Sequence, residues 1–531
     1  MDEVAAPAVM TLTTLPYGLF LAALCLMYWL AATEGWRLRI LLVSSFLFYG
    51  LVFSGALGLS ALDAGAIFQC FAYLPLLLVS TLINFWIGLM LGQHSPLSSH
   101  NQDLQLSEEE WEYAQIDWGQ KRLYLLWMGI LLNVLLLLGF KYVPFFVEVI
   151  SNLVGWEMGP IVAKEIRENL IAPLGLSFFC FESIGYLIDV YRGAPATGNF
   201  LRFSTYKFFF PKLISGPICG YHAVSRQLRQ VQFPKMNQWA EALWLLGLGA
   251  CKKVLVADRL GIFVDLSYGN LERAGSGDIW LTVLVYGLQL YLDFSGYVDM
   301  ARGSALLLGI VLPENFDAPY FTTSIADFWR RWHMTLGNWL RNYLYFPLGG
   351  SRQGLNRTCF NLLIVMLIAG IWHGASWGFI VWGIFHGLAL ILHRLTLALG
   401  NRFHLVKAWW KTIPGTIVAW GVTQAFIFWS WIFFRLPDLK QSRLALHHFW
   451  GWGGDIQFAQ KVYLDTLGLD RLQFTIVILG LVGVLCLCYG LRQLTKLQLN
   501  WPLKLVFAPL LLYAVLQLAP DGAFSYIYFD F

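Results

Sequence analysis

Two histidines are the side chains best suited to chemistry in this sequence. His333 follows two arginines and a tryptophan, and His373 lies between two tryptophan-containing apolar runs. Imidazole titrates near neutral pH, so it can act as a general acid or base. A low-dielectric site favours the neutral, proton-accepting form. His373 and His333 are therefore the first candidates for functional residues.

The position of His373 relative to Arg357 predicts that this histidine lies inside a membrane. The two residues are 16 positions apart, which is about 24 Å of α-helix and less than the roughly 30 Å of a hydrocarbon core. An ionisable side chain at that depth is costly and is a functional candidate by default. The alternative is a neutral structural histidine bonded to a backbone carbonyl. Close backbone contacts are expected at Gly370, Gly374 and Gly378.

Polar groups near His373 could donate hydrogen bonds to a bound molecule. Candidates near His373 are the Ser376 hydroxyl, the indole groups of Trp372 and Trp377, and backbone N–H groups around Gly374. The sequence does not choose among them.

The segment from Asp327 to Arg357 is rich in arginine and aromatic residues. A helix of this composition lies at a membrane interface or lines a polar cavity, and its arginines favour the cytoplasmic side. Offsets of three and seven would place Trp329, Trp332 and Trp339 on one helical face, which is typical of an interfacial aromatic belt. The arginines are Arg330, Arg331, Arg341, Arg352 and Arg357.

Four acidic residues lie within apolar stretches and need cationic or hydrogen-bonding partners if they are buried. We expect structural ion pairs rather than direct catalysis, with Arg330, Arg331 and Arg341 as the partners. The acids are Glu182, Asp189, Asp293 and Asp299.

The helices that must position these side chains are apolar enough to cross a membrane. Hydrophobic residues make up 58% of the 531 positions and charged residues 13%, against about 25% charged in soluble domains. Uncharged runs at Ile40–Leu62, Phe71–Gly92 and Leu123–Phe140 have the roughly 20 residues that a span requires. We expect one all-α membrane domain over 1–531 with about ten to twelve crossings. Further spans are predicted near 17–32, 171–190, 241–256, 279–292, 360–392, 413–434, 474–491 and 503–518.

Basic residues in short loops predict the orientation. Arg37 and Arg39 follow the first helix, and Lys121 and Arg122 end a loop at about 93–122, so we place both on the cytoplasmic side and the N-terminus outside. No basic, aromatic-interleaved stretch predicts nucleic-acid binding. The eight cysteines show neither disulfide nor zinc spacing, and no metal site is expected.

Several long blocks follow one another in a fixed order. They are PLGLSFFCFESIGYLIDVYRG (173–193), FFFPKLISGPI (208–218), LYLDFSGYVDMARG (290–303), LPENFDAPYF (312–321), DFWRRWHMTLGNWLRNYLYFPLGG (327–350), WHGASW (372–377) and WGIFHG (382–387). With these blocks the chain resembles the membrane-bound O-acyltransferases, in particular the bacterial branch typified by alginate O-acetyltransferases. The motif-bearing core covers about 173–393.

The resemblance implies a fold and a set of site residues. The family fold is a ring of about eleven transmembrane helices with re-entrant segments, in which a cytoplasmic tunnel meets an outer funnel near the catalytic histidine. The family's WHG histidine corresponds to His373, and its RWH histidine corresponds to His333. For attack of a hydroxyl group on an activated carbonyl, the resemblance implies that His373 is the general base; a covalent acyl-His373 intermediate is a second route. His333 would position the donor or relay protons. The oxyanion would be stabilised by Ser376, Trp372, Trp377 or backbone N–H groups around Gly374. Arg330 and Arg331 would attract an anionic donor or contact phospholipid. The expected supporting or channel residues are Trp332, Arg330, Arg331, Asp327, Asp293, Asp299, Trp372 and Ser376.

The chain departs from the family pattern at four positions, none of which is either histidine. The family usually has aspartate where Asn342 stands, so the ion network around Arg341 is expected to differ. The other departures are at Gly220, Val298 and Gly337.

The resemblance also implies the reaction and its partners. We expect transfer of an acyl group, acetyl before others, from cytoplasmic acetyl-CoA or another acyl thioester towards hydroxyls of an extracytoplasmic polysaccharide or an acyl-accepting protein. The chain would be a multi-pass protein of the inner or plasma membrane, in contact with lipids and without a bound cofactor. Alternatives are D-alanyl or other acyl transfer to a cell-envelope polymer, a transporter or flippase, and a scaffold that docks through residues 94–122.

Overall fold

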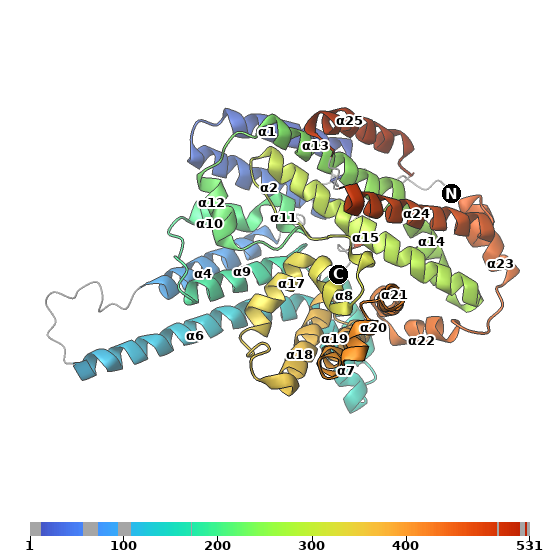
Figure 1. Ribbon diagram of the computed structural model, residues 1–531. Coiled ribbons are helices and arrows are strands. Elements are labelled where there is room, and N and C mark those ends of the chain that lie inside the picture. The colour runs from blue at the N-terminus through green and yellow to red at the C-terminus, as the bar shows by residue number, and fades with distance from the viewer. Residues whose placement is uncertain are drawn as a thin grey trace. The chain divides into compact units, whose positions relative to one another are not determined.

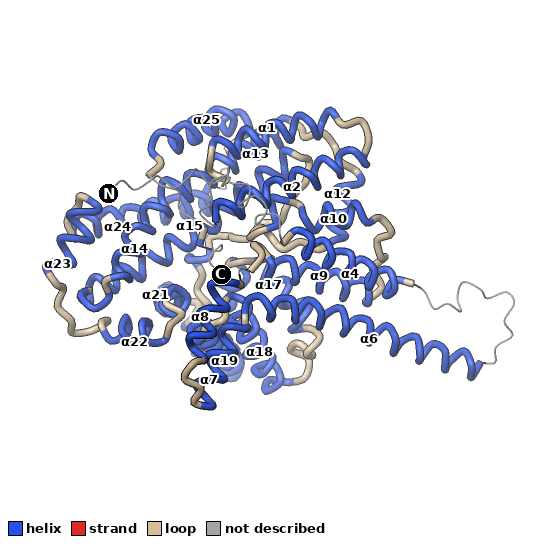
Figure 2. The backbone as a smooth tube through the Cα atoms, turned by 180° about the vertical axis from the view of Figure 1, so that it is seen from behind, coloured by secondary structure: helices blue, strands red, loops and turns tan. Residues whose placement is uncertain are grey.

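The computed structural model describes residues 12–56, 73–93, 108–170, 172–495, 499–520 and 526–527 (Figure 1). Within these ranges the chain forms helices joined by turns and loops, and no strand is present (Figure 2). The all-α architecture predicted from the sequence is therefore confirmed for the described part of the chain.

Contacts divide the chain into two compact units, Met1–Lys235 with Ser304–Leu312 and Met236–Gly303 with Pro313–Phe531. The expectation of a single domain stays a prediction. The helices of the first unit are α1 (Leu15–Leu30), α2 (Glu34–Ala56), α4 (Leu74–Gly92), α6 (Glu108–Lys141), α7 (Val143–Val154), α8 (Gly159–Asn169), α9 (Leu176–Tyr191), α10 (Phe200–Phe208), α11 (Phe210–Leu213) and α12 (Tyr221–Arg229).

The second unit carries all of the expected catalytic residues. Its elements are α13 (Met236–Ala250), η1 (Cys251–Ala257), α14 (Asp258–Gly269), η2 (Leu271–Arg273), α15 (Ser276–Leu307, whose last turn belongs to the first unit), η3 (Pro319–Phe321), α16 (Ile325–Arg331), α17 (Met334–Leu340), η4 (Arg341–Tyr345), α18 (Gly354–His373), α19 (Trp377–Arg402), α20 (His404–Trp409), α21 (Ile413–Arg435), α22 (Leu439–His447), α23 (Ile456–Phe458), η5 (Ala459–Asp465), α24 (Arg471–Thr495) and α25 (Trp501–Leu518).

Nine helices among the described residues are long and apolar enough to cross a membrane, which makes the chain a multi-pass membrane protein. Two shorter apolar helices, α1 and α7, add to this set. The ring and the tunnel implied by the family remain expectations. The nine are Glu34–Val52, Leu74–Gly92, Asp117–Lys141, Ser276–Leu307, Gly354–His373, Trp377–Gly400, Ile413–Arg435, Arg471–Thr495 and Trp501–Leu518.

The segment expected as a loop at 93–122 is partly helical. Residues 94–107 lie outside the described part of the chain, but α6 already begins at Glu108. Acidic residues in a first helical turn interact favourably with the helix dipole, and glutamate, alanine and glutamine are good helix formers. The second half of the expected loop is therefore the start of a helix that continues into the span Asp117–Lys141.

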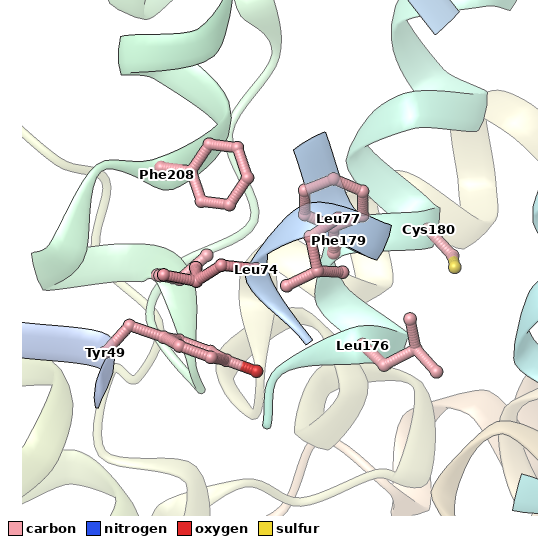
Figure 3. Close-up of a cluster of buried hydrophobic side chains, with 8 residues drawn as sticks. Tyr49, Leu74, Leu77, Leu176, Phe179, Cys180 and Phe208 are labelled. Atoms are coloured by element: carbon pink, nitrogen blue, oxygen red, sulfur yellow. The ribbon is translucent and has the colours of Figure 1, made fainter. Parts of the chain in front are cut away.

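An apolar core holds the first unit together between α2, α4, α9, α10 and α11 (Figure 3). Aromatic and branched side chains fill most of this core and pack closely against one another. The cluster consists of Tyr49, Leu74, Leu77, Leu176, Phe179, Cys180, Phe208 and Leu213.

In the second unit, α18 and α19 form a tight antiparallel hairpin that depends on glycine. A Cβ atom on Gly370 would lie 2.3 Å from the Phe379 carbonyl oxygen, and one on Gly383 would lie 2.6 Å from the Met366 carbonyl oxygen. A Cβ on Gly374 would lie 2.2 Å from the Phe379 ring, and one on Gly378 would lie 2.5 Å from the Cα of Pro437. The predicted close backbone approach is confirmed at Gly370 and Gly378. At Gly374 the neighbour is the side-chain ring of Phe379, and the contact at Gly383 was not predicted.

We expect Gly370→Ala to force α18 and α19 apart and to lower stability by about 1–3 kcal/mol, the usual cost of overpacking. A thermal melt of the purified protein in detergent would show this as a lower Tm. Gly421→Ala on α21 is the matched control, because a Cβ there has no atom within 4 Å. Equal melting temperatures for the two variants would contradict the packing described above.

Candidate active site

The two candidate histidines are brought together through one tryptophan. His373 is the last residue of α18, and His333 lies between α16 and α17. The Trp372 ring lies 4.8 Å from the His373 ring and 6.1 Å from the His333 ring, between centroids. His333 is fully buried and His373 is 3% exposed. Residues that are 40 positions apart in the sequence thus share one aromatic contact.

His333 has a left-handed backbone with φ 44° and ψ 52°. This conformation costs a non-glycine residue roughly 1–2 kcal/mol, so the neighbouring chain must hold it. Asn315 does so: its carbonyl oxygen accepts from the Met334 N–H at 3.0 Å, and its side-chain oxygen accepts from the Thr335 N–H at 3.0 Å. Burial lowers the pKa of His333 to about 3, so this imidazole is neutral at pH 7.

The break at Trp332 and His333 corrects one sequence inference. Trp332 is extended, with φ −105° and ψ 130°, so α16 ends at Arg331. Trp329, Trp332 and Trp339 therefore do not share one helical face as expected. Ser324 caps the start of α16 by accepting a hydrogen bond from the Asp327 N–H at 3.2 Å.

Aromatic rings surround His373 on three sides. Trp372, Trp382 and Phe434 lie 4.8, 5.2 and 5.0 Å from its ring, all at steep interplanar angles. The rings come from α18, α19 and α21 respectively. Such an enclosure of apolar rings excludes water and lowers the local dielectric.

A hydrogen-bonded chain runs beside this enclosure and fixes a third histidine. The Trp329 indole donates to His386 Nδ1 at 3.2 Å, so His386 Nε2 carries the proton and donates to the Ser430 hydroxyl at 3.0 Å. Ser430 in turn donates to the Ile427 carbonyl at 2.7 Å. No role was predicted for His386 from the sequence, although the WGIFHG block contains it.

The acids on α15 are paired, as expected, but with lysines instead of the expected arginines. Lys253 Nζ lies 3.0 Å from Asp293 and 2.8 Å from Asp258, and Lys252 Nζ lies 2.6 Å from Asp299. Both lysines belong to the π-helical turn η1. Close contact between α13 and α15 at Gly249 and Gly296 brings η1 within reach of the acids.

The same correction applies to Glu182 in the first unit. Its carboxylate lies 2.6 Å from Lys212 Nζ and 4.0 Å from Lys207 Nζ, and all three side chains are buried. Only arginines were expected as partners from the sequence; Lys207 and Lys212, which lie just before and within the FFFPKLISGPI block, were not considered.

The arginines expected to neutralise these acids lie elsewhere. Arg331 pairs with Asp327 one turn earlier in α16 at 3.2 Å, and Arg341 donates to the Asn338 side chain at 3.0 Å. Arg330 is exposed. Their proposed contacts with an anionic donor stay predictions.

The donors proposed near His373 are placed differently from one another. The Ser376 hydroxyl donates a hydrogen bond to the Pro437 carbonyl at 2.7 Å, so in this conformation its proton is not available to another acceptor. Trp377 is 49% exposed. Trp372 is buried against both histidines and remains close to the reacting centre.

An apolar cavity of about 920 Å³ lies in the second unit next to the aromatic cluster. Phe316 and Tyr320 line it, and their rings lie 5.1 and 6.0 Å from Trp332. Neither His333 nor His373 lines this cavity. Trp332, which was expected as a supporting residue, contacts the cavity wall through Phe316 and Tyr320. Among the described residues, no group of three histidine, cysteine, aspartate or glutamate side chains could hold a metal ion.

These features define a multi-pass, all-helical membrane protein with a buried histidine in an aromatic enclosure. The model of the membrane-bound O-acyltransferase (MBOAT) family matches residues 17–432. The chain belongs to this family and is an O-acyltransferase, as the resemblance implied.

Relatives of several specificities are similar over most or part of the chain. A peptidoglycan O-acetyltransferase of Helicobacter pylori is 33% identical, covering 86% of this chain and 88% of the relative. A probable alginate O-acetylase AlgI of Pseudomonas putida is 32% identical, covering 97% and 98%. A teichoic acid D-alanyltransferase of Streptococcus thermophilus is 31% identical, covering 43% and 58%.

We expect Lys253→Met to destabilise the protein by about 3–5 kcal/mol, because it leaves two buried carboxylates without their cation. Lys252→Met is the matched control: the Lys252–Asp299 pair is more exposed, at 23% and 13%, and Arg302 lies 3.9 Å from Asp299. The measurement is the Tm of each purified variant. Adding Asp293→Asn to Lys253→Met should recover part of the loss, and an unchanged Tm for Lys253→Met would refute the role of this pair.

Proposed function

We propose that the protein transfers an acetyl group from cytoplasmic acetyl-CoA to hydroxyls of an extracytoplasmic polysaccharide, in the inner or plasma membrane. The observation that carries the proposal is His373, buried at the end of a membrane helix and enclosed by Trp372, Trp382 and Phe434. The alginate and peptidoglycan O-acetylating relatives cover most of the chain, which supports acetyl as the group transferred.

His373 would act as the general base. The acceptor hydroxyl loses its proton to the imidazole as its oxygen bonds to the thioester carbonyl carbon. The tetrahedral intermediate then collapses, the C–S bond breaks, and the imidazolium returns the proton to the thiolate. The products are the O-acetyl ester and free CoA thiol, so the histidine ends in its starting form.

His333 would act through position rather than proton transfer. Its neutral imidazole packs on Phe294 at 4.9 Å and on Trp372 at 6.1 Å, and Trp372 packs on His373. Asn315 holds the left-handed backbone of His333 and so fixes the position of the imidazole against Trp372.

A base inside the bilayer suits transfer across a membrane. The activated donor exists in the cytoplasm, while a surface glycan lies outside. A route closed by the reacting groups lets the acetyl unit cross without a continuous water path. D-alanyl transfer is the second candidate, supported by the teichoic acid D-alanyltransferase relatives. Those relatives match only about half of the chain, so acetyl is favoured.

We expect His373→Ala to lower acetyl transfer by about 10²- to 10⁴-fold, the usual contribution of general acid–base catalysis. The purified protein in nanodiscs would be given radiolabelled acetyl-CoA and surface glycan, and ester formation would be followed. His447→Ala, at an exposed histidine of α22, should retain wild-type activity and serves as the control.

Two results would count against this proposal. Normal ester content in surface glycan from His373→Ala cells would reject the role of this histidine. Turnover of a D-alanyl thioester in place of acetyl-CoA by the wild-type protein would reject the donor.

A further inference from the structure

Two indole N–H groups in the enclosure are buried without an acceptor. Trp382 on α19 and Trp431 on α21 are each 1% exposed. Neither Nε1 atom has a hydrogen-bond partner among the described residues. A buried donor that lost its water and gained nothing in return is unfavourable, and native proteins rarely keep one without a use.

Other tryptophans of the same chain show that an indole N–H is normally satisfied here. Trp329, whose ring lies 5.8 Å from that of Trp382, donates to His386. Trp29 donates to the Leu307 carbonyl at 3.0 Å, and Trp420 donates to the Tyr320 carbonyl at 2.9 Å. In this respect Trp382 and Trp431 differ from Trp329 in the cluster and from Trp29 and Trp420 outside it.

Both unsatisfied indoles lie beside the candidate base. The Trp382 ring is 5.2 Å from the His373 ring and perpendicular to it, at 89°. Trp431 stacks on Trp382 at 6.1 Å and 20°. Both also lie 5.4 Å from Phe434, which itself contacts His373 at 5.0 Å. The two donors are thus at most one ring removed from the imidazole.

We propose that the indole N–H groups of Trp382 and Trp431 bind the carbonyl oxygen of the acyl thioester and stabilise its oxyanion. This inference rests on the proposed function, since it needs an acyl donor at His373. Ser376, Trp372, Trp377 and backbone N–H groups were the donors expected from the sequence for stabilising the oxyanion.

An indole donor fits the chemistry of this step. Indole N–H donates a hydrogen bond but accepts none and does not titrate in the working range, so it cannot compete with His373 for the hydroxyl proton. Stacked rings fix the donors before the reaction, and fixed donors in a water-poor site are the most effective oxyanion stabilisers. When the hydroxyl oxygen attacks, the carbonyl electron pair moves onto the oxygen that these donors face, and it returns as the C–S bond breaks.

The test replaces each indole by an isosteric ring that lacks only the donor. Trp382→benzothienylalanine and Trp431→benzothienylalanine keep the bicyclic shape and remove the N–H. We expect kcat for acetyl-CoA to fall by about 10²-fold in each, with KM changed far less and Tm equal to or above the wild-type value. Trp29→benzothienylalanine is the control, because it removes a satisfied N–H in the first unit and should leave kcat unchanged.

A second readout reports on the carbonyl itself. Acetonyl-CoA, a ketone analogue that cannot be cleaved, would be bound with a ¹³C-labelled carbonyl, and its infrared stretch would be recorded. The stretch should lie at lower frequency in the wild type and in Trp29→benzothienylalanine than in the two site variants. If a benzothienylalanine variant accumulates poorly, Trp382→Phe or Trp431→Phe replaces it. The carbonyl stretch should again lie at higher frequency in these variants than in the wild type.

The outcomes separate this inference from the proposed function. Wild-type turnover with unchanged kcat and carbonyl frequency in both site variants would overturn the inference alone and would assign the two N–H groups to a structural water. No turnover of acetyl-CoA by the wild type would overturn the proposed donor and this inference together.

Discussion

Contact between α18 and α19 at Gly370 and Gly383 is the constraint on which the site depends, because it leaves no room for a side chain between the two backbones. The hairpin places His373, the last residue of one helix, against Trp382 on the next. A third helix, α21, closes the enclosure with Phe434. Apolar helices without these glycines would be separated by side chains, and the imidazole would then face lipid or water instead of three rings.

Charge is arranged around this packing rather than within it. Asp293 and Asp299 of α15 are neutralised by the adjacent lysines of η1, at 2.6 to 3.0 Å, and the aromatic enclosure holds no charged side chain among its described contacts. Separating the two keeps the dielectric low around His373, where the proposed mechanism uses a neutral imidazole. The ion pairs stabilise α15, while the rings set the environment of the candidate base.

The sequence predicted the helical class, the enzyme family and the close contacts at Gly370 and Gly378, because each depends on local composition or on contiguous blocks. It missed features that depend on tertiary contacts. The break at His333 could not be anticipated, since a left-handed residue held by Asn315 leaves no periodic signal. Lys253 lies within the predicted span near 241–256, and the sequence does not show which carboxylates it reaches. Trp382 and Trp431 gain their meaning only from the positions of other helices, and their N–H groups look ordinary in the sequence.

The last described residues add a temporal constraint to biogenesis. The Ile527 N–H donates to the Asp293 carboxylate at 3.1 Å, and Lys253 Nζ lies 4.6 Å from the centroid of the Tyr526 ring. The network around α15 therefore joins segments that leave the ribosome more than two hundred residues apart. A nascent chain can insert its helices early, but its charge network stays incomplete until residues 526–527 have been synthesised. Until then the Asp293 carboxylate lacks one of its hydrogen-bond donors, so the helices around α15 reach their final stability only after these residues have docked.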